Sequence, residues 1–222
     1  MQLAKSALDV GLYTNRLAPM LEFWQKRARL PLAEMLPVGG GVRQHRHAVG
    51  QSVFKLNHAR DPLDPAPPSG LTKLAIFADG LESPDALVDP DGNALLLQPR
   101  CADSPNLRLT LAANDVPRTR AFYGEVLGLP ADASGFYQVG TSQIEIVQGA
   151  VTPGPQQAMG YRYMTFQVFD VVLEHDQITA RGGDEGLAPV RLGEVAYISF
   201  VRDPDGNWIE LSQRKSITGS LA

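Results

Sequence analysis

The sequence has almost no cysteine, since Cys101 is the only one among its 222 residues. An internal disulfide framework is therefore excluded, and the composition fits a reducing compartment. The first ten residues lack the apolar core of a signal peptide, and no long apolar run follows. We therefore expect a cytoplasmic protein that does not insert into a membrane.

An excess of positive charge is also missing. The chain carries 20 Lys and Arg residues against 24 Asp and Glu residues, a formal net charge of −4. A general nucleic-acid binder has a basic footprint, so we expect no nucleic-acid partner. The hydrophobic fraction of 44% is ordinary for a globular protein, and the length allows one large domain or two small ones.

What is present is a repeat. The pentapeptide Asp-Pro-Asp-Gly-Asn occurs at residues 89–93 and again at 203–207. Its proline, glycine and Asx residues predict a tight reversal, and the apolar flanks predict a β-hairpin at each copy. Further matched residues keep a constant offset within each block, which indicates a duplicated fold. They are Phe23 with Phe122 and Pro31 with Pro130, 99 apart, and Ser52 with Ser142 and Gly70 with Gly160, 90 apart.

The remaining elements follow from periodicity and from capping residues. Helices are predicted to begin near Leu17 and after Asp115, and a third to span 171–181 between Asp170 and Gly182. A polar link near Cys101 divides the chain into an N-terminal domain, 1–100, and a C-terminal domain, 101–222. The predicted strands are 9–14, 42–49, 52–58, 71–78, 107–112, 136–139, 142–147, 161–168, 196–202 and 208–213.

These features together resemble the vicinal oxygen chelate superfamily, the glyoxalase, bleomycin-resistance protein and extradiol dioxygenase group. The resemblance rests on Phe122-Tyr123 before Leu127-Gly128-Leu129-Pro130, and on the closing Asp-Pro-Asp-Gly-Asn hairpin followed by Ile209-Glu210-Leu211. It implies an α+β fold of two tandem domains built from paired βαβββ units. The second unit, at 71–98, is degenerate because residues 79–85 replace its helix.

The resemblance also implies where a metal ion would be held in members that use one. Four strand positions in each half supply the ligands, and lysine or arginine cannot serve there because both are cationic donors. In this sequence the positions are Asp9, Lys55, Lys73 and Leu96 in the first half, and Arg108, Glu145, Tyr163 and Glu210 in the second. Because several of these residues are lysine or arginine, we predict no bound metal cofactor.

The resemblance implies two cup-shaped halves, and the strand pattern predicts what the residues inside each cup do instead of binding a metal. Lys55 and Lys73 alternate with apolar neighbours, so their own face is concave, and a two-residue turn at Gly50-Gln51 pairs Arg46 with Lys55 and Gln44 with Asn57. Such cations favour an anionic ligand. We predict that Arg108, Lys55, Lys73, Arg46, Asp9 and Asn57 bind substrate, and that Glu210, Glu145 and Tyr163 are catalytic.

Several alternatives stay open. The charged residues of the first cup can be a solvated or ion-paired face, and Arg108 between Glu145 and Glu210 can be a purely structural ion cluster. The cups can pair units within one half or across halves. A one-residue slip would also turn His45 and His47 into the cup, where a His-x-His pair can bind metal.

The function hypothesis is an enzyme of glyoxalase or dioxygenase type, a lyase, isomerase or oxidoreductase, acting on a small anionic or oxygen-rich molecule. The alternative is a binding protein that sequesters its ligand, as bleomycin-resistance relatives do. Either is expected to be a monomer or a homodimer.

Overall fold

The computed structural model describes residues 1–221, which form four consecutive units of strands and helices. The first unit contains β1 (Leu3–Thr14), α1 (Leu17–Glu22), the π-helical turn η1 (Phe23–Arg27), β2 (Leu32–Gly39), β3 (Val42–Val49) and β4 (Ser52–Ala59). The second contains β5 (Leu71–Ala78), β6 (Asp85–Val88) and β7 (Ala94–Pro99). It has no helix, as the degenerate repeat predicted.

The second half of the chain repeats this plan. The third unit contains β8 (Leu107–Ala113), α2 (Val116–Ala121), the π-helical turn η2 (Phe122–Val126), β9 (Tyr137–Val139) and β10 (Ser142–Gln148). The fourth contains β11 (Gly160–Val168), α3 (Val171–Ala180), β12 (Asp184–Leu192), β13 (Ala196–Arg202) and β14 (Trp208–Arg214), and α4 (Lys215–Thr218) follows it. In every unit the first and last strands are parallel neighbours.

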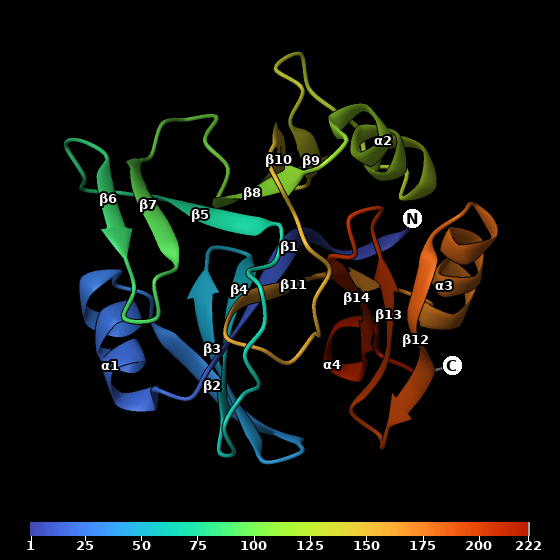
Figure 1. Cartoon of the computed structure of the whole chain (residues 1–222), viewed down its shortest axis with the longest axis horizontal. Helices are drawn as coiled ribbons and strands as arrows, with labels where there is room; N and C mark the ends of the chain where they lie inside the picture. Colours follow the sequence, from blue (N-terminus) through green and yellow to red (C-terminus); the bar gives the residue numbers. More distant parts are fainter. Residues whose placement is uncertain (222) are drawn as a thin grey trace.

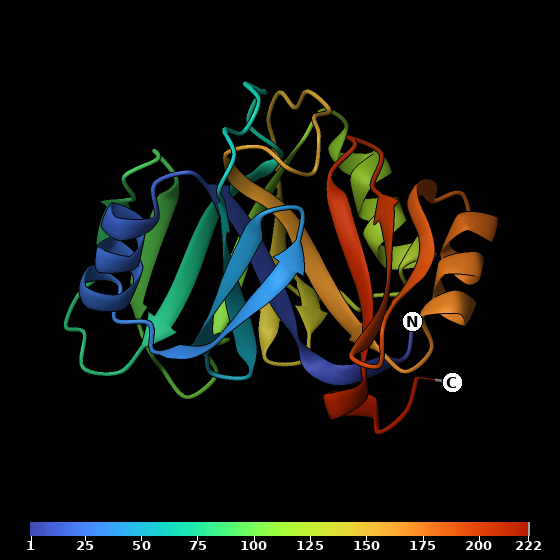
Figure 2. The same ribbon diagram turned by 90° about the horizontal axis from the view of Figure 1, so that it is seen from below.

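Each sheet combines one unit from each half of the chain. Sheet A, with strand order β12-β13-β14-β11-β1-β4-β3-β2, joins the fourth unit to the first. Sheet B, with order β6-β7-β5-β8-β10-β9, joins the second unit to the third. The halves lie mainly to the left and right in Figure 1, and the sheets run across both (Figures 1 and 2). The link at residue 101 lies between β7 and β8, so strands from both sides of it enter both sheets.

Two strands, β2 and β12, were missed from the sequence. Both lie at the outer edges of sheet A, and most of their residues are exposed. Each contains a proline and lacks a buried apolar face, which is how edge strands avoid further pairing. These two strands therefore lack the alternation of apolar and polar residues from which a strand is predicted. β1 also begins at Leu3, six residues before the predicted start.

The repeated pentapeptide closes a hairpin in each half, as predicted. The Asp203 carboxylate accepts hydrogen bonds from the backbone N–H groups of Asp205 and Asn207, both at 2.9 Å. Asp89 does the same for Asp91 at 3.0 Å and Asn93 at 2.9 Å. Asp203 also accepts from the buried hydroxyl of Tyr123 at 3.3 Å. The Phe122-Tyr123 motif and the closing hairpin at residues 203–207 are therefore in direct contact.

One apolar core lies between the two sheets and the helices. Sheet A contributes one face of its strands, including Leu8, Val10 and Phe54, and sheet B contributes residues such as Leu74 and Leu109. Trp24 from η1 stacks on Phe54 at 3.9 Å between ring centroids. The alternate face of sheet A is left to form a cup that points away from this core.

Among residues 1–221, no helix has both the length and the apolar content to cross a lipid bilayer.

Candidate functional site

The register of sheet A brings residues from both halves of the chain onto one concave face. On this face Asp9 of β1 lies opposite Thr165 of β11, and Thr165 lies opposite Glu210 of β14. Lys55 of β4 stands beside Gly11, two residues along β1 from Asp9. Of the two pairings left open by the sequence, the structure has the one across halves. We call this face the sheet A cup.

The floor of the cup is a three-residue hydrogen-bonded cluster. The Lys55 ammonium donates to Thr165 Oγ1 and to Glu210 Oε2, each at 2.7 Å, and the Thr165 hydroxyl donates to the same Glu210 oxygen at 2.6 Å. The Lys55 side chain is 3% exposed and that of Glu210 is 12% exposed. Burial lowers the pKa of the Lys55 amine, and the charges of Glu210 and Asp9 oppose this fall.

Asp9 completes the floor on its other side. Its Oδ1 accepts from Lys5 Nζ at 2.5 Å and from the backbone N–H of Val53 at 2.8 Å. Its second oxygen, Oδ2, is buried and has no hydrogen-bond partner among the described residues. A buried carboxylate oxygen without a partner is costly in a structural site. Asp9 therefore leaves one acceptor free at the floor.

The wall on the β2–β3 side carries further charge. Arg46 Nε lies 2.7 Å from Glu34, Arg46 Nη1 donates to Gln44 at 2.8 Å, and Arg214 lies 3.5 Å from Glu34. The pairing of Arg46 with Lys55 confirms the two-residue turn at Gly50-Gln51. The cup thus holds the four cations Lys5, Arg46, Lys55 and Arg214 against the three carboxylates Asp9, Glu34 and Glu210. This balance favours an anion.

Aromatic rings form the rest of the cup. The Tyr163 hydroxyl accepts from Asn57 Nδ2 at 3.1 Å, and its ring lies 5.3 Å from the Lys55 ammonium. Burial raises the pKa of Tyr163 well above its usual range, and the charge of Tyr13 adds to the effect. Tyr163 is thus a neutral hydroxyl at neutral pH. Tyr13, Phe200 and the half-buried Trp208 pack around it.

The other predicted site residues lie in sheet B and not in the sheet A cup. Lys73 of β5, Leu96 of β7, and Arg108 and Glu145 of β8 and β10 all lie in sheet B. Arg108 donates to Gln143 at 2.8 and 2.9 Å and covers the Phe136 ring at 4.0 Å. Glu145 accepts from Thr110 at 2.8 Å. The proposed cluster of Arg108 with Glu145 and Glu210 is therefore wrong, because Arg108 and Glu210 belong to different sheets.

The histidines face away from the cup. His45 pairs with Leu56 and His47 with Phe54, so both lie on the side that η1 covers, where His47 Nε2 is 3.2 Å from Gln25. The slipped register that would carry them into the cup does not occur. Burial lowers the pKa of His47 to about 4. His175 is buried on α3 and lies 3.0 Å from Glu185.

A divalent ion does not fit the sheet A cup. Such an ion needs about three or four N, O or S ligands with no cation among them. Here the Lys55 ammonium already lies between Thr165 and Glu210, and Lys5 occupies one Asp9 oxygen. Across residues 1–221, no group of three or more His, Cys, Asp or Glu side chains is arranged to hold a metal.

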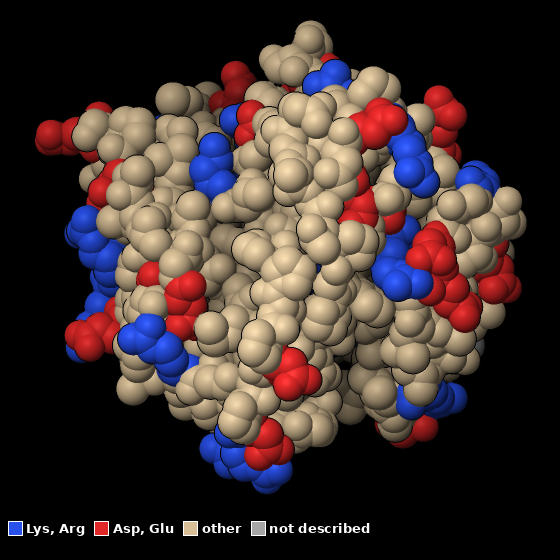
Figure 3. Space-filling model, in the orientation of Figure 1, with Lys and Arg blue, Asp and Glu red and all other residues tan. Residues whose placement is uncertain are grey.

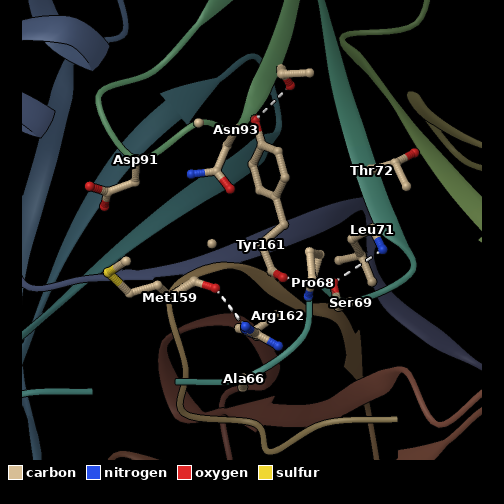
Figure 4. Close-up of a pocket in the computed structure, with 13 residues that line it drawn as sticks. Ala66, Pro68, Ser69, Leu71, Thr72, Asp91, Asn93, Met159, Tyr161 and Arg162 are labelled. Atoms are coloured by element: carbon tan, nitrogen blue, oxygen red, sulfur yellow. Dashed lines mark hydrogen bonds between the residues drawn. The ribbon is translucent and has the colours of Figure 1, made fainter. Parts of the chain in front are cut away.

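Two surface hollows lie outside the cup. One, of about 290 Å³, is bordered by Asp91, Asn93, Tyr161 and Arg162, and Figure 4 shows the Tyr161 ring standing within it. Its polar groups are committed, because Tyr161 donates to the Ala94 carbonyl at 3.0 Å and Arg162 to backbone carbonyls. A second, of about 480 Å³, lies between α2 and the hairpin at 203–207. Neither contains the Lys55–Thr165–Glu210 cluster.

Charge outside the cup shows no single-sign patch on the face seen in Figure 3. Lys and Arg alternate with Asp and Glu around its edge, and its centre is mostly uncharged.

Sequence reasoning missed Thr165, Lys5, Glu34 and Arg214 in the site. Thr165 was missed because the metal-ligand position was assigned to Tyr163, two residues earlier on β11. Strand alternation placed both on one face, and that signal could have found it.

The two sheets, built from four consecutive units of strands and helices, have the fold expected from the sequence, that of tandem vicinal oxygen chelate domains. Residues 107–211 match the sequence model of the Glyoxalase/Bleomycin resistance protein/Dioxygenase superfamily, which confirms the expected resemblance for this part of the chain. A search of the curated proteins found no match.

Solved structures with the same fold span the whole chain. Glyoxalase I from Zea mays has a TM-score of 0.75 at 17% identity, covering 96% of this chain and 92% of its own. A point mutant of that glyoxalase I has a TM-score of 0.76 at 16% identity, covering 100% and 96%. A putative dioxygenase from Bacillus subtilis has a TM-score of 0.68 at 12% identity, covering 100% and 91%. These likenesses show the fold.

Proposed function

We propose that the protein binds a small anionic or oxygen-rich organic molecule in the sheet A cup and acts on it as a metal-independent enzyme. The observation that carries this proposal is the Lys55–Thr165–Glu210 cluster, a carboxylate and an ammonium held 2.7 Å apart at the cup floor. Opposite charges fixed in a nearly water-free site act on a ligand more strongly than they would in water.

Proton abstraction beside a carbonyl group is the reaction class that these groups suit. Glu210 is the less buried partner, and only its Oε2 receives hydrogen bonds from the described residues. Its carboxylate takes the proton from the carbon, and the electron pair of that C–H bond moves to the carbonyl oxygen as an enolate. Lys55 and the neutral Tyr163 hydroxyl are donors for that oxygen. Arg46 positions an anionic substituent.

Deuterium exchange tests this reaction class directly. Dihydroxyacetone phosphate, hydroxyacetone and pyruvate are incubated with the protein in heavy water, and exchange at the carbon beside the carbonyl is followed by NMR. We expect the wild type to accelerate exchange for at least one probe, and Glu210→Gln to remove the acceleration. Glu145→Gln in sheet B is the matched control and keeps it. Exchange at the uncatalysed rate with every probe would refute proton abstraction.

A sequestering protein is the second candidate, favoured by the aromatic wall of Tyr13, Tyr163, Phe200 and Trp208. Flat rings suit a planar ligand that is held whole. Salicylate, a planar aromatic carboxylate, is the probe, and calorimetry gives its affinity. Saturable binding that depends on Arg46 and Lys55, without exchange of any carbonyl probe, would favour this alternative over the enzyme.

A further inference from the structure

The floor of the sheet A cup is arranged around a cation that the chain itself supplies. Oxygen atoms from two strands, Thr165 of β11 and Glu210 of β14, lie 2.7 Å from the Lys55 ammonium. Asp9 of β1 lies near enough for its charge to act on the same amine. The lysine side chain comes from the fourth strand, β4, and is almost fully buried.

We propose that the Lys55 ammonium is the resident cation of this cup, occupying the position that a divalent metal ion would otherwise take. The oxygens that contact it, the Glu210 carboxylate and the Thr165 hydroxyl, are of the kind that hold a hard or borderline cation, and the Asp9 carboxylate acts on it through its charge. Asp9 Oδ2, buried without a hydrogen-bond partner, is the acceptor that a larger or more highly charged ion would use.

The charge of residue 55 is therefore the one in contact with both Thr165 and Glu210, whereas Lys5 holds only the other oxygen of Asp9, Oδ1. With lysine there, a divalent ion meets a fixed positive charge within the site, and Glu210 already has an ionic partner. A carboxylate or an imidazole at position 55 would remove that charge and add a ligand. Asp9, Glu210 and the new side chain would then supply three ligands from three strands of one sheet, with Thr165 beside them.

The resident ammonium of the cup does not depend on the proposed reaction. A cup with its own ammonium needs no metal supply and cannot be emptied by a chelator. The ammonium has a single charge, and two of its three N–H groups donate to Thr165 and Glu210, so it offers one donor to a ligand oxygen.

Metal binding by variants at position 55 tests the inference. The wild type, Lys55→Glu and Lys55→His are titrated with Zn²⁺ and Mn²⁺ by calorimetry, and the metal retained after gel filtration is measured. We expect the wild type to retain none, and at least one of the two variants to retain about one equivalent, with affinity at least a hundredfold higher than the wild type. Adding Glu210→Gln to that variant should abolish the gain.

Lys73→Glu is the matched control, since it makes the same charge change in sheet B. It should gain no metal. If the position 55 variants unfold without metal, their melting temperatures with and without added Zn²⁺ decide, and recovery of folding by the ion supports the inference. Folded variants that bind no ion would overturn it. So would a wild type that retains one equivalent and loses it on Glu210→Gln, whatever the outcome of the exchange experiment.

Discussion

At the scale of single residues, the cup depends on a glycine. Gly11 of β1 lies directly beneath the Tyr163 ring, and a Cβ placed on it would lie 2.1 Å from Tyr163 Cε1. Any larger residue there displaces the ring and breaks its hydrogen bond with Asn57. The sequence shows Gly11 within a predicted strand, where glycine is otherwise unfavourable. The close approach of a side chain explains it.

We expect Gly11→Ala to destabilise the protein by about 1–3 kcal/mol, the usual cost of forcing a group into a packed core. Urea denaturation measures this loss. Gly124→Ala is the control, because a Cβ on Gly124 has its nearest neighbour at 3.6 Å, an ordinary contact. A Gly11→Ala variant as stable as the wild type would show that Tyr163 is not held in the described position.

His47 gives the fold a pH dependence. Burial lowers its pKa from 6.5 to about 4, so the unfolded chain binds the proton more readily than the folded protein between these values. The contribution of neutral His47 to the free energy of unfolding is therefore fully present above pH 6.5 and is lost as the pH falls towards 4. The loss is on the order of 3 kcal/mol at most.

Replacing His47 with Leu should remove this component. Urea unfolding of both proteins at a series of pH values from neutral down to about 4.5 gives the difference in free energy of unfolding. We expect that difference to move in favour of the variant as the pH falls. His45, whose charge also lowers the pKa of His47, is kept unchanged in both. A difference that is constant with pH would contradict the expected titration.

At the scale of elements, buried and exposed strands differ in how far they can be predicted. β10 and β14 have buried apolar residues on one face, and alternation found them. β2 and β12 face solvent over most of their length and gave no such signal. The positions of Lys55 and Glu210 on cup faces followed from alternation. Their contact could not, because it depends on which units share a sheet.

The hairpin at residues 203–207 is attached to α2 through a buried hydrogen bond. Thr119 Oγ1 donates to the Asp205 carboxylate at 2.9 Å. Thr119→Val keeps the shape and removes the donor, so we expect a loss of about 1.5–3 kcal/mol, as for hydrogen bonds to charged groups. Thermal denaturation measures it. Thr152→Val, at an exposed loop position after β10, should change stability by less than about 0.5 kcal/mol. Equal effects of the two changes would show that the hydrogen bond between Thr119 and Asp205 does not stabilise the protein.

At the scale of the whole molecule, the two halves are related by an approximate two-fold axis. Ser52 and Ser142, matched residues of the repeat, form a hydrogen bond of 2.8 Å between their Oγ atoms, so the axis passes between them. The first unit pairs with the fourth through β1 and β11, and the second pairs with the third through β5 and β8. Neither half contains a complete sheet without the other.

This symmetry predicts how the second half behaves alone. In the fragment 101–222, β11 lacks the β1 partner that it has in the intact chain, and β8 lacks β5. A second copy of the fragment supplies β8, the counterpart of β1, to pair with β11, and the axis becomes exact, with Ser142 facing Ser142 of the other copy. We therefore expect the fragment to form a symmetric homodimer and the intact chain to satisfy the same surfaces within itself.

Light scattering coupled to gel filtration measures the mass of the fragment, and circular dichroism shows whether it folds. We expect a folded species of twice the fragment mass, which loses its secondary structure on dilution because folding and association are linked. Adding fragment 1–100 should convert it into a heterodimer with the mass of the intact protein. A folded monomer of 101–222 would mean that the half is a self-sufficient domain whose own two units pair with each other.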